Sequence, residues 1–164
     1  MTLAILIAIS LMWLPVGLLF LGHGEAKGTG AICAFVGVSV VIAAFVDVLQ
    51  GDPFTAGLLF AHGLLYCVVA FALLAGLENL KSVGNVSLTV AIISFIYMLL
   101  YYHVKGSNYF TMACAGYTIL TLEVWLNAYG KLSAKILAWS LIIWVPIGLY
   151  IPAFLLLSEK PLPF

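Results

Sequence analysis

The sequence predicts an all-α membrane protein with six transmembrane helices arranged as three consecutive helix hairpins. Apolar residues make up 65% of the 164-residue chain and charged residues only 7%, and the mean hydropathy is +1.24. A soluble domain of this size has roughly a quarter of its residues charged. A surface this apolar is stable only against lipid, so residues 1–164 are expected to form a single six-helix transmembrane domain.

Six apolar runs are long enough to cross a membrane, because a spanning helix needs about 20 apolar residues. They comprise residues 2–22, 29–50, 54–77, 83–103, 108–130 and 134–157. The short breaks between them contain Gly, Asp, Asn, Ser or Pro, which form turns. Each helix must therefore return beside the one before it. The first run lacks a basic leader and a clear cleavage site, so we expect a retained helix.

The lysines predict the orientation of the bundle. The odd loops carry Lys27, Lys81, Lys131 and Lys135, and the opposite side carries Lys105 and Lys160. This excess predicts cytoplasmic odd loops and both termini on the external or periplasmic side of the inner membrane. The formal net charge is zero, which argues against a nucleic-acid partner, because binding phosphates requires clustered basic residues.

The runs hold no set of residues suited to catalysis, a cofactor or a metal. Cys33, Cys67 and Cys114 lie inside apolar runs without a CxxC pair, and we interpret them as buried packing thiols. His62 is a lone mid-span histidine and is interpreted as a packing residue. Because ion channels and proton pumps usually keep charged residues inside the bilayer, the passive passage of a neutral solute is favoured over either.

Two carboxylates lie in or near the runs. Glu123 lies roughly 10 Å inside the fifth run at helical rise and must face the protein interior or a watery cavity. Asn127 lies one turn further on the same face and can donate to it. Either an interhelical hydrogen-bond clamp or a polar vestibule at a pore mouth is consistent with this pair. Asp47, near the end of the second run, is interpreted as an interfacial charge.

The aromatic residues divide by depth. Those near the ends of the runs are mostly interpreted as interfacial belts, and they are Phe54, Tyr101, Tyr102, Tyr109, Phe110, Trp125 and Tyr129. The deeper rings could equally line a pore or pack at helix crossings, and they are Trp13, Phe60, Tyr66, Tyr117 and Trp144.

Three stretches form a recognisable pattern along the chain. The first comprises Val16–Leu19, Gly24–Thr29 and Phe35–Gly37; the second Gly57–Phe60, Leu65–Tyr66, Gly76–Glu78 and Ser87–Ile92; the third Trp139 and Ile151–Leu156. Together they cover most of the chain, and in their order and early spacing they resemble the AmiS/UreI family, six-helix channels for urea and short-chain amides.

The resemblance implies a passive channel for small neutral amides such as urea and acetamide, with a pore through each protomer and a hexameric ring of protomers. It implies an aromatic and aliphatic selectivity slot formed by Leu6, Ile9, Trp13, Phe60, Leu64, Tyr117 and Trp144. Helical spacing independently places Leu6, Ile9 and Trp13 on one face.

The sequence departs from the family pattern at two polar pore positions, where Val16 replaces Asn or Asp and Trp144 replaces a glutamate. The long histidine-bearing outer loop of the acid-gated members is reduced to Gly51–Pro53. We therefore expect no acid gating of that type, and the amide channels are the closer analogue. The alternative is a non-transporting membrane scaffold or subunit without a continuous pore.

Overall fold

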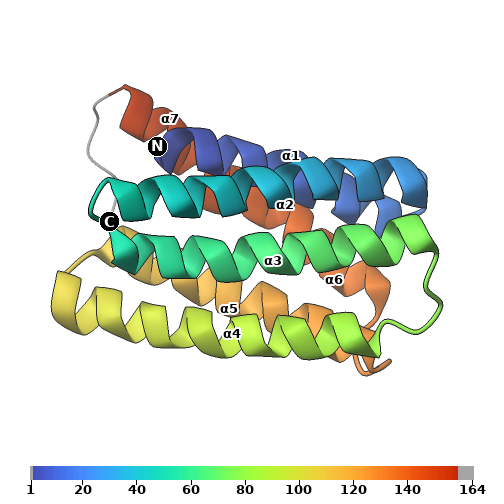
Figure 1. The fold of residues 1–164 in the computed structure, drawn as a ribbon. Coiled ribbons are helices and arrows are strands. Elements are labelled where there is room, and N and C mark those ends of the chain that lie inside the picture. The colour runs from blue at the N-terminus through green and yellow to red at the C-terminus, as the bar shows by residue number, and fades with distance from the viewer. Residues whose placement is uncertain (1, 159–164) are drawn as a thin grey trace.

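The computed structural model describes residues 2–158, which form six helical rods (Figure 1). The rods are α1 (Thr2–Phe20), α2 (Ala26–Leu49), α3 (Pro53–Ala75), α4 (Lys81–Leu100) extended by the π-helical η1 (Tyr101–Lys105), α5 (Asn108–Ala128), and α6 (Ala134–Trp144) continued through the π-helical η2 (Val145–Tyr150) into α7 (Ile151–Leu157). Consecutive rods run in opposite directions, as the short breaks in the sequence predict.

The polar residues in the breaks begin the helices. The side chains of Glu25, Asp52, Ser107 and Ser133 each accept a hydrogen bond from a backbone N–H three residues further on, which caps α2, α3, α5 and α6. The second helix begins at Ala26, three residues earlier than predicted, because Glu25 caps it.

Among the described residues, four stretches are both long and apolar enough to span a membrane, namely α2, α3, Lys81–Lys105 and Ala134–Leu155. In α1 the stretch Ala4–Phe20 is apolar but shorter. The fifth rod is less apolar because it carries threonines, tyrosines, Glu123 and Asn127. An all-helical membrane protein is therefore confirmed, whereas the crossing of the bilayer by all six rods stays a prediction.

The closest helix pairs are α2 with α3 and α4 with α5, while α1 packs against α6, η2 and α7. The first helix also contacts the second, the third contacts the fourth and the fifth contacts the sixth, so the arrangement as three consecutive hairpins stays a prediction. Small residues explain why α2 with α3 and α4 with α5 are the closest pairs. A Cβ on Gly37 would lie 2.9 Å from the backbone N of Cys67, one on Gly63 3.0 Å from the N of Val41, and one on Gly84 2.8 Å from a side chain of α5. Glycines at these crossings let the backbones approach closely.

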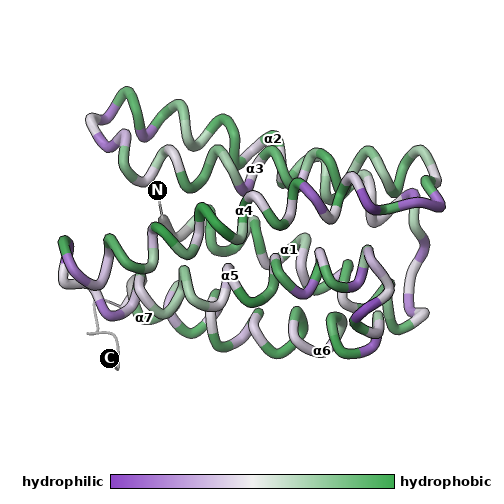
Figure 2. Tube along the Cα trace, turned by 90° about the horizontal axis from the view of Figure 1, so that it is seen from below, coloured by the Kyte–Doolittle hydropathy of each residue, from purple (hydrophilic) through white to green (hydrophobic). Residues whose placement is uncertain are grey.

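The outer surface of the bundle is apolar along its length. Hydrophilic residues gather mainly at the two ends (Figure 2). Large side chains such as Phe35, Phe45 and Leu49 on α2 are exposed on the single chain. A surface of this kind suits the hydrocarbon of a bilayer and does not suit water.

Candidate functional site

Two internal cavities and a surface vestibule follow one another along the bundle. Cavity I has a volume of about 100 Å³ and is lined by α1, α3, α4, α5 and α6. Cavity II has about 60 Å³ and is lined by α1, α2, α3, η1 and α5. Cavity I includes Leu19 of α1 and Leu80 beyond α3, whereas cavity II includes Ile5 and Thr55, which lie at the opposite ends of these helices. The cavities therefore lie end to end.

The vestibule opens at the end of the bundle that carries the α2–α3 turn and has a volume of about 560 Å³. It shares Asp47, Thr55, Tyr101 and Phe110 with the lining of cavity II. Tyr66 in turn is shared by cavities I and II. A series of hollows thus runs from the vestibule through cavity II to cavity I.

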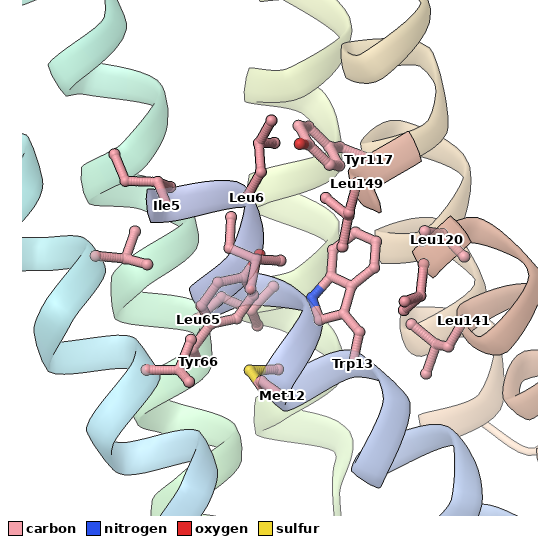
Figure 3. Close-up of a cluster of buried hydrophobic side chains, with 14 of the residues drawn as sticks. Ile5, Leu6, Met12, Trp13, Leu65, Tyr66, Tyr117, Leu120, Leu141 and Leu149 are labelled. Atoms are coloured by element: carbon pink, nitrogen blue, oxygen red, sulfur yellow. The ribbon is translucent and has the colours of Figure 1, made fainter. Parts of the chain in front are cut away.

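Four buried rings lie where the two cavities meet, and we refer to Trp13, His62, Tyr66 and Tyr117 as the ring junction. Trp13 meets Tyr117 edge-on, with ring centroids 5.7 Å apart. The imidazole of His62 lies 5.1 Å from the Tyr117 ring and 6.0 Å from the Tyr66 ring. Figure 3 shows Trp13 extending from α1 toward Tyr117. Trp13 lines cavity I, His62 and Tyr117 line cavity II, and Tyr66 lines both.

The histidine of the ring junction is hydrogen-bonded to a side chain of α4. Its Nε2 is hydrogen-bonded to the Ser94 hydroxyl at 2.9 Å, and its Nδ1 lies 3.5 Å from the Tyr66 hydroxyl. Ser94 is fully buried. His62 is therefore both a satisfied core residue, as predicted, and a polar group in the wall of cavity II.

The structure brings together four of the seven predicted lining residues. Leu6, Ile9 and Tyr117 line cavity II, and Trp13 lines cavity I. All four side chains are buried. The spacing of three and four residues along α1 thus places one apolar face of this helix toward the hollows.

The two predicted lining residues on α3, Phe60 and Leu64, lie outside the cavities. Phe60 and Leu64 are 40% and 44% exposed, and Phe60 meets Phe45 of α2 with ring centroids 5.9 Å apart. Neither residue lines cavity I or II, so the structure places both of them outside these two hollows. His62 and Tyr66 show which face of α3 turns inward, since residues four apart share a helix face.

Trp144 does not line the two cavities either. It lies half-buried in a lateral groove of about 350 Å³ between α5 and α6. A Cβ on Gly116 or Gly148 would overlap its ring, so these glycines make the space that the indole fills. The predicted pore position is instead a residue of the helix crossing.

Glu123 and Asn127 do not pair with each other. The Ser140 hydroxyl of α6 donates to Glu123 Oε1 at 3.0 Å, and Asn127 Nδ2 donates to the Leu132 carbonyl at 3.0 Å. Glu123 is therefore an interhelical clamp between α5 and α6. Asn127 fixes the α5–α6 turn and lines cavity I, so the predicted hydrogen bond from Asn127 to Glu123 is wrong.

Sequence reasoning missed the inward position of Asp47, Tyr101 and Tyr109. Both tyrosines are buried and line cavity II, so the belt interpretation is wrong for them. Asp47 also lines cavity II. The inward position of Asp47 could have been predicted from its helical spacing to Val40 and Ala43, which are buried on the same face of α2.

Within residues 2–158 no group of three or more His, Cys, Asp and Glu side chains could hold a metal ion. The thiols of Cys33 and Cys114 are buried, that of Cys67 is partly buried, and all three are free.

Residues 1–160 match the family model described as "AmiS/UreI family transporter". Two solved structures have a similar fold. The chain is 20% identical to the closed-state urea channel of Helicobacter pylori, with a TM-score of 0.85 over 97% of this chain and 98% of that one. A crystal structure of the urea channel from the same organism gives 17% identity and a TM-score of 0.83, over 98% of this chain and 100% of that one. No curated protein matches the chain significantly.

Proposed function

The chain belongs to the AmiS/UreI family of transporters, and on this premise we propose that it is a passive channel for small neutral amides such as urea and acetamide. The observation that carries the proposal is the series of hollows, vestibule, cavity II and cavity I, inside a single chain. The two similar solved structures are urea channels, which supports a solute of this class.

The size of cavity II suits such a solute. A buried hollow needs at least about 10–15 Å³ to hold one water molecule, and cavity II, with a volume of about 60 Å³, exceeds this several-fold. Urea and acetamide each have four non-hydrogen atoms. The cavity can therefore take one molecule at a time, and its mainly apolar wall cannot repay the dehydration of an ion.

The ring junction is the proposed selectivity slot, together with Leu6 and Ile9 of cavity II. A flat molecule can pass between rings that meet edge-on once one ring turns aside. The imidazole of His62 and the hydroxyl groups of Tyr66 and Tyr117 offer hydrogen bonds at the narrowest point. Binding there must stay weak, because flux requires that the solute leaves as readily as it binds.

The setting of the channel follows the resemblance and the lysine distribution. We place the protein in the inner membrane with both termini and the vestibule on the external side. A hexameric ring, as the resemblance implies, would leave one passage in each protomer.

Stopped-flow light scattering of proteoliposomes tests the function. Urea, formamide, acetamide and propionamide are presented to vesicles with and without the protein, at equal lipid composition and size. We expect faster influx of the smaller amides and no increase in ionic conductance. Rates equal to those of protein-free vesicles for all four solutes would refute the channel and favour a scaffold without a continuous pore.

A further inference from the structure

Asp47 is a buried carboxylate at the point where the vestibule meets cavity II. It is only 9% exposed and contributes to the lining of both hollows. Its side chain takes part in none of the hydrogen bonds that join the described residues. The neighbouring carboxylate differs, because Asp52 Oδ1 accepts the backbone N–H of Thr55 at 3.0 Å and so caps α3. Asp47 is thus a carboxylate at this mouth that caps no helix and whose side chain is hydrogen-bonded to none of the described residues.

The surroundings of Asp47 favour donors over acceptors. The vestibule contains two carboxylates, Asp47 and Asp52, and one ammonium group, that of Lys105. The Lys105 ammonium lies 5.1 Å from the centre of the Phe54 ring. A solute that leaves the vestibule for cavity II therefore passes an acceptor group backed by a second negative charge.

We propose that Asp47 is a specificity-determining residue of this passage, whose carboxylate binds the N–H donors of an arriving solute before it reaches the ring junction. The inference rests on the proposed function. An ionised carboxylate has two oxygens and can accept two parallel hydrogen bonds from one planar group. Urea and acetamide present N–H donors in a plane, whereas acetate, of nearly the same shape, presents only negative oxygens and is repelled.

The same geometry predicts a blocker. Guanidinium has the planar outline of urea with a positive charge, and it binds carboxylates through paired, charge-assisted hydrogen bonds. It cannot continue, because the rings and apolar walls beyond Asp47 do not repay the dehydration of an ion. Guanidinium should therefore occupy the mouth of cavity II and slow the influx of acetamide.

The experiment measures acetamide influx into proteoliposomes with increasing guanidinium chloride on both sides, at constant ionic strength. We compare the wild type with Asp47→Asn, which keeps the size of the side chain, and with Asp47→Glu, which keeps its charge. Glu25→Gln is the matched control, because it removes an exposed carboxylate from the opposite end of α2. Size-exclusion profiles establish that each variant is folded.

We expect guanidinium to inhibit the wild type and Glu25→Gln equally, and sodium acetate at the same concentration to have no effect. In Asp47→Asn the half-inhibitory concentration should rise about tenfold or more, because hydrogen bonds to a charged group are lost. Asp47→Glu should restore part of the inhibition. Equal inhibition of Asp47→Asn and wild type, or a wild type that carries acetamide without inhibition by guanidinium, overturns the inference and leaves the proposed function standing. A wild type with lipid-only acetamide rates overturns both.

Discussion

Replacing Trp13 tests whether the ring junction limits passage. The indole is buried, lines cavity I and meets Tyr117 of the cavity II wall edge-on at 5.7 Å. Removing it in Trp13→Ala should join cavities I and II into one hollow. We therefore expect solutes to pass faster, and we expect larger amides to gain more than small ones.

The magnitude follows from the contact that a solute must open. An edge-to-face aromatic pair contributes about 0.5–1.5 kcal/mol beyond the area it buries. At about 1.36 kcal/mol for each factor of ten in rate, the loss of this barrier raises the rate of acetamide influx about 2- to 13-fold. The same substitution leaves a cavity and lowers the free energy of unfolding by about 3–5 kcal/mol. Trp13→Leu fills part of that space and is the second variant, in case Trp13→Ala does not fold.

The assay is stopped-flow influx of formamide, acetamide and propionamide at matched amounts of folded protein. Two controls are available in the chain. Trp139 is a half-exposed tryptophan in the lateral groove, and Phe60 is an exposed aromatic residue of α3. Alanine at either position should leave the order and ratios of the three rates unchanged. Unchanged rates in both Trp13 variants, or an equal gain for all three solutes, would refute the ring junction as the selectivity slot.

Three further substitutions test the packing around the passage. Gly37→Ala places a Cβ within 3 Å of the α3 backbone and should lower the unfolding free energy by about 1–3 kcal/mol, measured by thermal fluorescence in detergent. Asp52→Ala removes the α3 cap and should cost about 0.5–2 kcal/mol at neutral pH. Because hydrogen bonds from the Thr55 side chain and backbone hold the pKa of Asp52 below its ordinary 3.8, the stabilisation is present above that value. It is lost as the pH falls through the lower folded pKa, so the melting temperatures of wild type and variant should converge below about pH 4. Glu123→Ala breaks the bond to Ser140 and should cost about 1 kcal/mol without changing acetamide rates, since Glu123 lines neither cavity.

Hydropathy and turn residues were sufficient to predict the helical rods, but not which helices pair or which faces turn inward. Glycines occur in every rod, so the crossing of Gly37 with Gly63 depends on a tertiary register that one sequence does not reveal. On α3, Phe60 and Tyr66 are both aromatic. In a helix that is apolar all round, hydrophobic periodicity cannot separate a lipid-facing ring from one that lines a cavity.

Polar side chains carry the information that hydrophobicity lacks in such a helix. In lipid a polar group must find a partner inside the protein, so it marks the inward face. Ser87 and Ser94 lie seven residues apart on α4, and both are fully buried. Thr121 on α5 is 96% buried. His62 marks the inward face of α3 in the same way, and Asp47 that of α2. Reading these positions instead of the largest rings places His62 and Tyr66, and not Phe60, at the passage.

The same polar residues explain how the rings of the junction keep their positions without closing the hollows. The Ser87 hydroxyl donates to the Thr121 carbonyl of α5 at 2.8 Å, and Ser94 is bonded to His62 of α3. Both bonds come from α4, which contributes little more than Val83 to the wall of cavity I. The fourth helix therefore ties together two helices that line the hollows while contributing little to the walls itself. Since these bonds fix α3 and α5 through α4, the proposed channel would need only side-chain rotation of a ring, and no separation of the helices, to let a solute pass.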